Sequence, residues 1–292
     1  MIRYEQELVE EILKKKELSA LDEDFISKKI SEFFKDIKNY QYKEKVLKKI
    51  EDSKSYSQFK KSKEYDFLIK GIRAELRKVY GAFILEEYAK KKDVLDELRK
   101  DRDDVSIHED LLMLHKSTKE RMGHYKILYD KIFENIKGEL VIMDIACGLN
   151  PVSNIYFKDR IKKYIASDIS SEDCDFLKEY FDIIRMDHEV FPLDLSDEKN
   201  FKMLSSHKCD VCFIFKSLDG IERVSRNITG KLLESIDARY FAITFPTLTL
   251  SGHRDIKENR RLWLERLLDR LGWKWKKELI ENELLYRVKK GN

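Results

Sequence analysis

The segment that most constrains the fold is an apolar run that ends in an acid and a glycine. Residues 140–143, Leu-Val-Ile-Met, are followed at once by DIACGLNP, residues 144–151. In open α/β sheets, ligands bind beyond the carboxyl ends of the strands, and the first strand-to-helix turn approaches the ligand with its backbone. Gly148 suits such a turn because a side chain would block the approach, and Ala146 is small enough for a tight turn. The segment predicts a strand and a ligand-binding turn, although D-x-A-x-G also occurs in ordinary strand turns.

The second half of the chain alternates short apolar runs with helical stretches. Four runs predict strands: ELVIMDIA, YIASDIS, DVCFIFK and YFAITFP, at residues 139–146, 164–170, 210–216 and 240–246. The C-terminal GWKWKKELIENELLYRVKK predicts two further strands joined by a turn near Glu281 and Asn282, as an antiparallel hairpin at the sheet edge. Alternating strands and helices indicate an α/β fold with a doubly wound, mainly parallel sheet.

The first hundred residues have a different pattern. They contain no proline, and their only glycines are Gly71 and Gly81. Apolar residues recur at three- and four-residue spacing, which predicts a helical bundle; examples are Phe25, Ile26, Ile30, Phe33, Phe34 and Ile37. Lysines interleave with tyrosines in KNYQYKEKVLKK, which is typical of a solvated helix face or of an RNA-backbone surface. We place a domain boundary near the charged segment KKDVLDELRKDRDD and predict a helical, Lys-rich, RNA-binding domain over 1–105 and a second domain over 106–292.

Charge and cysteine usage limit the classes of function. The 292 residues include 58 Lys and Arg against 55 Asp and Glu, so RNA binding must come from local clustering of charge. Cys209 and Cys212 form a C-x-x-C within an apolar run and lack further ligands nearby, which favours buried strand residues over a metal site. No apolar segment approaches the roughly 20 residues of a membrane span, and the charged N-terminus does not resemble a signal peptide. We expect a cytoplasmic protein with reduced cysteines, without metal or membrane attachment.

A second acid points to the kind of ligand. Asp168, in ASDIS, lies 20 residues after Gly148 at the end of the next expected strand. A carboxylate there can accept hydrogen bonds from both ribose hydroxyls, although a strand-terminal Asp is also a common helix N-cap. Asp144 is placed to accept from an ammonium group. Because neither G-x-G-x-x-G nor a Walker lysine is present, dinucleotides and ATP are disfavoured, and the pattern favours S-adenosylmethionine.

Six motifs in a fixed order carry a family resemblance. They are HKSTKER, DIACGLNP, FKSL, FPTLTLSG, ENRRLW and ENELLY, which begin at residues 115, 144, 215, 245, 258 and 281. With these motifs the chain resembles the aminoglycoside-resistance (Arm/FmrO-like) small-subunit rRNA guanine-N7 methyltransferases. The resemblance extends over about 108–288, and the N-terminal part matches only as a helical, basic extension. It implies a Rossmann-like class I methyltransferase domain that uses S-adenosylmethionine.

The resemblance also implies roles for residues around the methionine end of the cofactor. Arg121 meets the methionine carboxylate, which suits a guanidinium fork, and Glu120 orients Arg121. Asp144 and residues 146–148, Ala-Cys-Gly, line the methionyl side. His115 is expected to be structural or capping rather than a base.

Other residues are assigned to the nucleoside end. Asp168 holds the ribose, and we include its neighbour Ile169 as a cofactor-binding candidate. Asp194 and Leu195, in PLDLSD, flank the adenine. Asp187 is a competing candidate for the acid of this segment.

The chemistry implied by the resemblance needs no general base. Guanine N7 attacks with a lone pair and carries no proton, so catalysis rests on positioning and on accommodating charge that moves to the purine. From FKSL we take Phe215 as cofactor-binding, and Lys216 and Ser217 as target-side positioning residues. Lys216 could contact phosphate or the base, or extend from a strand end into solvent. The loop 247–254, with Ser251, Gly252, His253 and Arg254, is expected to be mobile and to contact RNA.

Three functions remain open from the sequence. We predict methyl transfer from S-adenosylmethionine to guanine N7 in small-subunit (16S-type) rRNA, either free or in the subunit. The alternatives are a tRNA guanine-N7 methyltransferase and a non-catalytic RNA-binding or ribosome-assembly factor with the same fold. The long, Lys-rich N-terminal extension departs from the resistance enzymes and indicates that a relative with another RNA target has to be considered.

Overall fold

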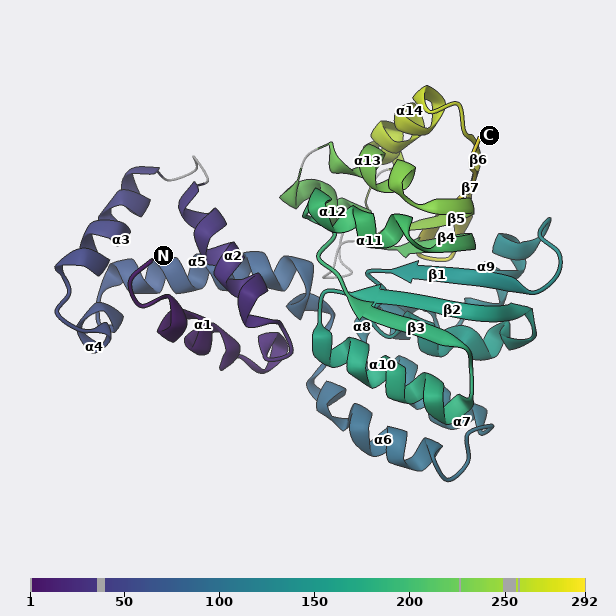
Figure 1. Ribbon diagram of the computed structural model, residues 1–292, viewed down its shortest axis with the longest axis horizontal. Coiled ribbons are helices and arrows are strands. Elements are labelled where there is room, and N and C mark those ends of the chain that lie inside the picture. Colours follow the sequence, from purple (N-terminus) through teal and green to yellow (C-terminus); the bar gives the residue numbers. More distant parts are fainter. Residues whose placement is uncertain (1, 36–39, 226, 249–255, 257, 292) are drawn as a thin grey trace. The chain divides into compact units, whose positions relative to one another are not determined.

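The chain forms two compact units in the computed structural model, which describes residues 2–35, 40–225, 227–248, 256 and 258–291. The units are Met1–Ala82 and Phe83–Asn292 (Figure 1). The division lies before the boundary predicted near residue 105. The reason is that Tyr88, Leu95 and Leu98 are buried in a hydrophobic core of the second unit.

The first unit is helical, as predicted. Its helices are α1 (Glu5–Leu13), α2 (Glu23–Lys35), α3 (Tyr40–Asp52), α4 (Tyr56–Lys60) and α5 (Lys63–Val79). The predicted apolar periodicity matches the buried side of α2, where Phe25, Ile26 and Ile30 are buried, whereas Ile37 lies outside the described residues. At Gly71, a Cβ would lie 2.6 Å from the Phe33 ring, so the absence of a side chain permits α5 to approach α2.

The second unit contains a seven-stranded sheet with the order β3-β2-β1-β4-β5-β7-β6. The strands are β1 (Leu140–Ile145), β2 (Ile161–Asp168), β3 (His188–Pro192), β4 (Lys208–Phe215), β5 (Asp237–Pro246), β6 (Lys274–Ile280) and β7 (Glu283–Lys289). Strands β1 to β5 are parallel, and the β6–β7 hairpin joins antiparallel to β5 at the sheet edge. The four predicted strands and the hairpin are confirmed. Strand β3 was not predicted, because its five residues HEVFP form too short an apolar run.

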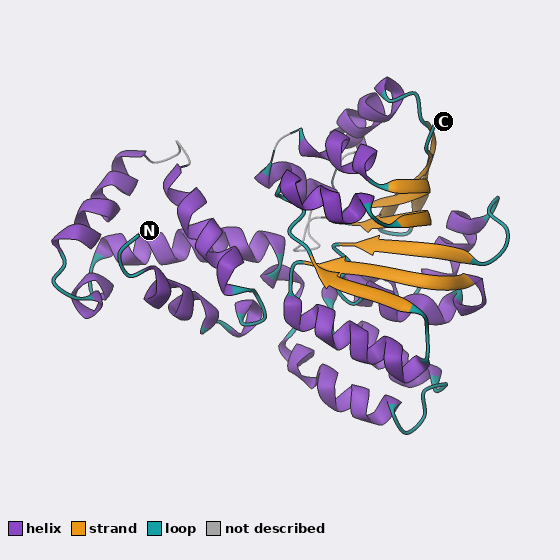
Figure 2. Cartoon of the chain, viewed as in Figure 1, coloured by secondary structure: helices purple, strands orange, loops and turns teal. Residues whose placement is uncertain are grey.

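Helices cover both faces of the sheet, which gives the three-layered α/β fold that the alternating pattern predicts (Figure 2). One hydrophobic core lies under α6 (Lys91–Leu98), α7 (Val105–Met113), α9 (Tyr125–Phe133) and α10 (Ser171–Ile184). The other lies under α11 (Phe201–Ser205), α12 (Leu218–Val224), α13 (Ile228–Ser235) and α14 (Leu262–Arg270). The short α8 (Lys116–Arg121) leads into α9. Cys209 and Cys212 are buried within β4, as predicted.

Strand direction brings distant parts of the chain to one edge of the sheet. Asp144 of β1 is in register with Ala166 of β2 and Phe213 of β4, so these parallel strands end together. Because β7 is antiparallel to β5, its first residue, Glu283, pairs with Pro246 at the end of β5 and lies at the same edge. None of the described helices is long and apolar enough to cross a membrane.

Candidate functional site

DIACGLNP predicts a tight turn after β1, and the structure shows that the backbone of this turn is left-handed at two residues. Ala146 has φ 50° and Gly148 has φ 51°. A Cβ on Gly148 would lie 3.1 Å from the imidazole of His115, which is buried and stacks on Phe83 with ring centroids 5.8 Å apart. Burial lowers the pKa of His115 to about 4, so the ring is neutral. The neighbour that excludes a side chain at Gly148 is therefore His115, whose role in this structure is to pack against the turn.

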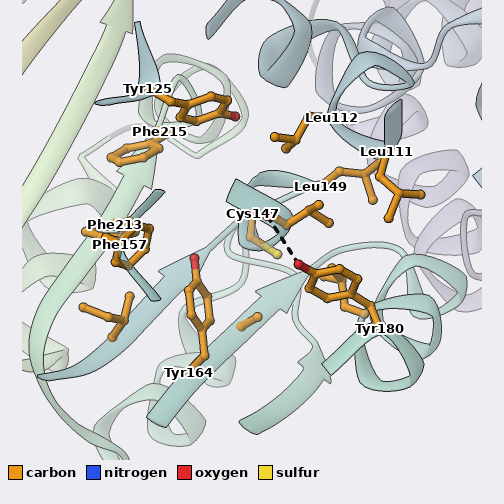
Figure 3. Close-up of a cluster of buried hydrophobic side chains, with 14 of the residues drawn as sticks. Leu111, Leu112, Tyr125, Cys147, Leu149, Phe157, Tyr164, Tyr180, Phe213 and Phe215 are labelled. Atoms are coloured by element: carbon orange, nitrogen blue, oxygen red, sulfur yellow. Dashed lines mark hydrogen bonds between the residues drawn. The ribbon is translucent and has the colours of Figure 1, made fainter. Parts of the chain in front are cut away.

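The thiol of Cys147 belongs to the hydrophobic core rather than to a reactive centre. Cys147 is buried, and its backbone N–H donates to the carbonyl of Ser167 at 3.1 Å. Figure 3 shows Cys147 and Leu149 side by side within the buried cluster. Burial raises the pKa of the Cys147 thiol well above its usual value, which disfavours a thiolate nucleophile.

Asp144 is a fully buried carboxylate, and only one of its oxygens accepts hydrogen bonds from the described residues. Its Oδ2 accepts from Nδ2 of Asn150 at 2.8 Å and from the hydroxyl of Tyr164 at 2.9 Å. Its Oδ1 is buried and accepts no hydrogen bond from the described residues. Burial raises the pKa of Asp144 to about 7. Because this buried oxygen lacks a hydrogen-bond donor, a cationic N–H group is a suitable partner for it.

Arg121 is the second group with an unused buried atom. Its guanidinium is 1% exposed, and Nε lies 2.9 Å from each carboxylate oxygen of Glu283. Nη1 donates to Oδ1 of Asn150 at 3.3 Å, whereas Nη2 has no hydrogen-bond partner among the described residues. Asn150 thus joins Arg121 to Asp144. The site presents a free guanidinium nitrogen and a free carboxylate oxygen, which are the complements of the carboxylate and the ammonium of an amino acid.

The prediction that Glu120 orients Arg121 is wrong. Glu120 is 45% exposed and accepts from Nζ of Lys216 at 2.9 Å. Glu283, which is 0% exposed, holds Arg121 instead. Glu120 follows the helical turn to the surface, whereas Glu283 begins β7 at the edge of the sheet where Arg121 lies.

Asp168 lies against the same turn. Its Oδ2 accepts from the N–H of Gly148 at 2.8 Å, and its Oδ1 accepts from the N–H of Ser170 at 3.3 Å. Burial, with a smaller effect of the Asp173 carboxylate, raises the pKa of Asp168 to about 6. The alternative that Asp168 caps the next helix does not hold, because Ser170 is the N-cap of α10 and accepts from the N–H of Asp173. Ile169 is partly buried beside Asp168.

The structure places the two candidate acids for the nucleoside end, Asp194 and Asp187, at opposite edges of the sheet. The N–H of Leu193 donates to the carbonyl of Asp168 at 2.7 Å, so the segment with Asp194 and Leu195 leaves the sheet next to Asp168. Oδ1 of Asp194 accepts from the N–H and hydroxyl of Ser196 at 2.8 and 2.6 Å. Asp187 is exposed and precedes β3, so it lies at the opposite edge of the sheet from Asp168.

The end of β4 completes the described site. Phe215 is buried, and Cζ of Arg121 lies 4.9 Å from its ring centroid. Lys216 has φ 56°, and its Nζ lies 2.9 Å from Glu120 and 3.2 Å from Glu283. The Oγ of Ser217 is buried and has no hydrogen-bond partner among the described residues.

The predicted RNA-contacting loop is only partly covered by the structure. Ser251, Gly252, His253 and Arg254 lie outside the described residues. Among the residues that are described, no group of His, Cys, Asp and Glu side chains is arranged to hold a metal ion.

Three residues of the site were missed by sequence reasoning. Asn150 and Glu283 lie in motifs that carried the resemblance, DIACGLNP and ENELLY, but nothing in their spacing showed that both contact Arg121. Tyr164 lies in an apolar strand and reads as a core residue, although its hydroxyl bonds Asp144. The sequence signal for Asn150 and Glu283 was that each is a polar residue within a motif of the family resemblance. Their contacts with Arg121 could not be predicted, because these contacts depend on the tertiary fold.

Known proteins resemble this chain over most of its length. The family described as "Ribosomal RNA methyltransferase (FmrO)" matches residues 62–287. A 16S rRNA (guanine(1405)-N(7))-methyltransferase of Frankia casuarinae is 26% identical over 230 residues, 76% of this chain and 80% of the relative. An enzyme of the same name from Serratia marcescens is 31% identical over 188 residues, 61% of this chain and 68% of the relative.

Solved structures share the fold over the whole chain. The 16S rRNA methyltransferase RmtF in complex with S-adenosyl-L-homocysteine superposes with a TM-score of 0.77 at 21% identity and covers 100% of both chains. The 16S rRNA methylase RmtB gives a TM-score of 0.69 at 24% identity and covers 99% of both. With the family match across most of its length, this chain belongs to the ribosomal RNA methyltransferase (FmrO) family.

Proposed function

We propose that this chain transfers the methyl group of S-adenosylmethionine to N7 of a guanine in 16S ribosomal RNA. The relatives carry this activity in their names, and the guanine equivalent to position 1405 of those names is the proposed target. The structural observation that carries the proposal is a pair of buried atoms, Oδ1 of Asp144 and Nη2 of Arg121, that have no hydrogen-bond partner among the described residues. Buried polar atoms are nearly always paired, so a ligand with an ammonium and a carboxylate is the natural partner of both.

The described residues fit S-adenosylmethionine along its length. Asp144 would take the ammonium and Arg121 the carboxylate of its methionine part, while Asp168 would take the ribose hydroxyls. Asp194 and Leu195 would flank the adenine. When bound, the cofactor supplies an electrophilic methyl group that the lone pair of guanine N7 can attack directly.

The chain's own residues would contribute positioning rather than proton transfer. No proton leaves N7, and the neutral His115 is packed against Gly148. We propose that Lys216 and Ser217, at the end of β4, position the target guanine. Glu120 and Glu283 hold the Lys216 ammonium, and the buried Ser217 hydroxyl is left without a protein partner among the described residues. Such preorganisation brings donor and acceptor into near-attack geometry.

Methyl transfer from radiolabelled S-adenosylmethionine tests the proposal. The acceptors are purified small subunits, free small-subunit rRNA and tRNA, each followed by borohydride and aniline cleavage at N7-methylguanine. Label with cleavage in the small subunit or its rRNA is the expected result. Label without cleavage would reject N7 as the acceptor, and label only in tRNA would establish the tRNA alternative. No label in any pool would favour a non-catalytic factor.

The alternatives have less support. The relatives' names specify 16S rRNA rather than tRNA. A non-catalytic factor has no need for buried atoms of Asp144 and Arg121 that the described part of the chain leaves without a partner, because such atoms weaken the fold unless a ligand satisfies them. We place the activity in the cytoplasm, where small subunits are found.

Cofactor affinity is expected to fall as the pH drops below about 7. Burial raises the pKa of Asp144 to about 7 and that of Asp168 to about 6. Both must be ionised to accept from the ligand, so protonation of Asp144 alone weakens binding by up to about tenfold per pH unit. Affinity should decline again at alkaline pH, where the α-ammonium group of the ligand loses its proton.

Calorimetric titration with S-adenosylhomocysteine across this pH range measures the effect. In Asp144→Asn, the step near pH 7 should disappear, while the step that belongs to Asp168 remains. An affinity that stays constant from neutral pH down to about pH 5 would contradict the assignment of both carboxylates.

The first unit is proposed to bind the RNA through its lysines. Lys45 and Lys48, on α3, are exposed, and neither forms an ion pair with another described residue. Replacing both by glutamine should weaken binding to small subunits by about tenfold and leave cofactor affinity unchanged, because phosphate contacts are lost. The control replaces Lys14 and Lys78, whose ammonium groups are already paired with Glu11 and Glu75. Equal losses in both double variants would mean that bulk charge, not the α3 surface, is responsible.

A further inference from the structure

The C-terminal hairpin carries like charges directly opposite each other. In the β6–β7 register, Lys274 faces Lys289, and Lys276 faces Arg287. Side chains two residues apart along a strand point to the same face, so these two like-charge pairs are neighbours on one face of the sheet. Like charges directly opposite are destabilising in an antiparallel pair. The like-charge pairs therefore destabilise the hairpin, and a function other than stability has to explain why they are present.

Carboxylates compensate only part of this charge. Arg287 lies 2.6 Å from Glu134 and 2.7 Å from Glu278, and Lys131 lies 3.3 Å from Glu278. We call these residues and the three lysines the hairpin face: Lys131, Glu134, Lys274, Lys276, Glu278, Arg287 and Lys289. It combines five cations with two carboxylates. Lys274, Lys276 and Lys289 are exposed, and no described residue forms an ion pair with any of them.

The other face of the same strand is balanced. Lys277 lies 3.0 Å from Glu265, and Nε1 of Trp275 donates to Asp269 at 2.8 Å. Both acids belong to α14, which covers that side. The excess of positive charge is therefore a property of one face and not of β6 as a whole.

Lysines on an edge strand often serve only to prevent edge-to-edge aggregation. That role would explain Lys274 and Lys276, because β6 is the edge strand. It does not explain Lys289, since β7 lies between β5 and β6 and has both edges paired. A negatively charged partner that contacts all three lysines explains why they are present.

We propose that the hairpin face binds the phosphate backbone of the RNA substrate, as a contact separate from the methyl-transfer site. This inference rests on the proposed function, which makes the substrate an RNA. Glu283 and Lys289 are six residues apart on the same face of β7, so the contact lies roughly 20 Å from the Arg121–Glu283 pair. Phosphates offer closely spaced charges that neutralise such a row of cations. An RNA that contacts the methyl-transfer site and the hairpin face at the same time has to be large and folded.

The test compares substitutions on the two faces of β6. Lys274→Gln with Lys289→Gln removes two cations from the hairpin face, and Lys277→Gln removes one from the balanced face. Dissociation constants for purified small subunits and for free small-subunit rRNA are measured against salt concentration, together with cofactor affinity by calorimetry. The double variant should bind both RNAs roughly three- to tenfold more weakly, with a log–log salt slope that is smaller by about 1–2. Cofactor affinity should remain unchanged, and Lys277→Gln should bind RNA as the unsubstituted protein does.

A third variant separates binding from stability. Lys274→Glu places opposite charges across the strand pair, so Tm should stay the same or rise by up to about 2 °C while RNA affinity falls. A fall in RNA affinity without a fall in Tm excludes misfolding as its cause.

Several outcomes would overturn the inference. These are unchanged RNA affinity in the double variant, an equal loss in Lys277→Gln, or a loss with subunits alone, which would indicate a ribosomal-protein contact. Aggregation of the double variant with intact RNA affinity would assign the lysines to edge protection. If the unsubstituted protein neither binds nor methylates subunits or rRNA, the proposed function itself fails.

Discussion

Replacing Glu283 by alanine is expected to lower the free energy of unfolding by about 3–5 kcal/mol, because it leaves two cations buried without their shared carboxylate. Arg121 and Lys216 both contact this side chain, which is 0% exposed. Burial by itself would raise the pKa of Glu283, but the charges of Arg121 and Lys216 hold it below the usual value. The carboxylate thus stabilises the fold above its unfolded pKa, and this contribution is lost as the pH falls through the lowered folded pKa.

Urea unfolding near neutral pH measures the loss. Glu120→Ala is the matched control, because Glu120 also contacts Lys216 but is 45% exposed, and its removal should cost no more than about 1 kcal/mol. Glu283→Gln, which keeps the shape and one acceptor, should be intermediate in stability and should bind the cofactor more weakly than the unsubstituted protein. Equal stabilities of Glu283→Ala and Glu120→Ala would show that the buried pair does not hold this edge of the sheet together.

Asp144→Asn is expected to weaken cofactor binding by about 10–100-fold without lowering stability above neutral pH. The amide can still accept from Asn150 and Tyr164, but it cannot provide a charge for the ammonium group. A charge-assisted hydrogen bond contributes about 1.5–3 kcal/mol, which corresponds to this range of affinity. Tm above neutral pH should not fall, because the substitution removes a buried charge whose pKa is raised to about 7.

Arg121→Lys provides the complementary variant. The lysine keeps a cation for Glu283 but loses the planar fork, of which Nη2 is the free arm. It should reduce cofactor affinity by about tenfold or more. Asp175→Asn, on the exposed side of α10, is the control that should bind normally. Normal affinity in both Asp144→Asn and Arg121→Lys would remove the basis for the cofactor assignment.

These expectations follow from the way the methionine end of the site is built. Arg121 comes from α8, Asn150 from the turn after β1, and Glu283 from the C-terminal hairpin. Asn150 contacts both Arg121 and Asp144, so the free guanidinium nitrogen and the free carboxylate oxygen are held relative to each other. The hairpin is therefore part of the site and more than an edge of the sheet.

Local patterns predicted much of this protein. The strand before Asp144, the tight turn at Gly148 and the acid at the end of the next strand were predicted because they have short-range causes, namely strand propensity and the steric demand of a tight turn. The N-cap of α10 shows the limit of such reasoning. Asp168 and Ser170 are both good capping residues, and only the backbone conformation decides that Ser170 caps the helix.

Sequence alone determined the parallel sheet, the helical first unit and the residues that line the turn, because periodicity and turn geometry depend on residues that are close together in the chain. Tertiary structure alone decided that the chain divides at Ala82, that Glu283 rather than Glu120 holds Arg121, and that Asp187 lies at the far edge of the sheet. The physical reason is that pairing of buried charges depends on strand direction and register. These bring together residues such as Arg121 and Glu283, which lie 162 positions apart in the chain.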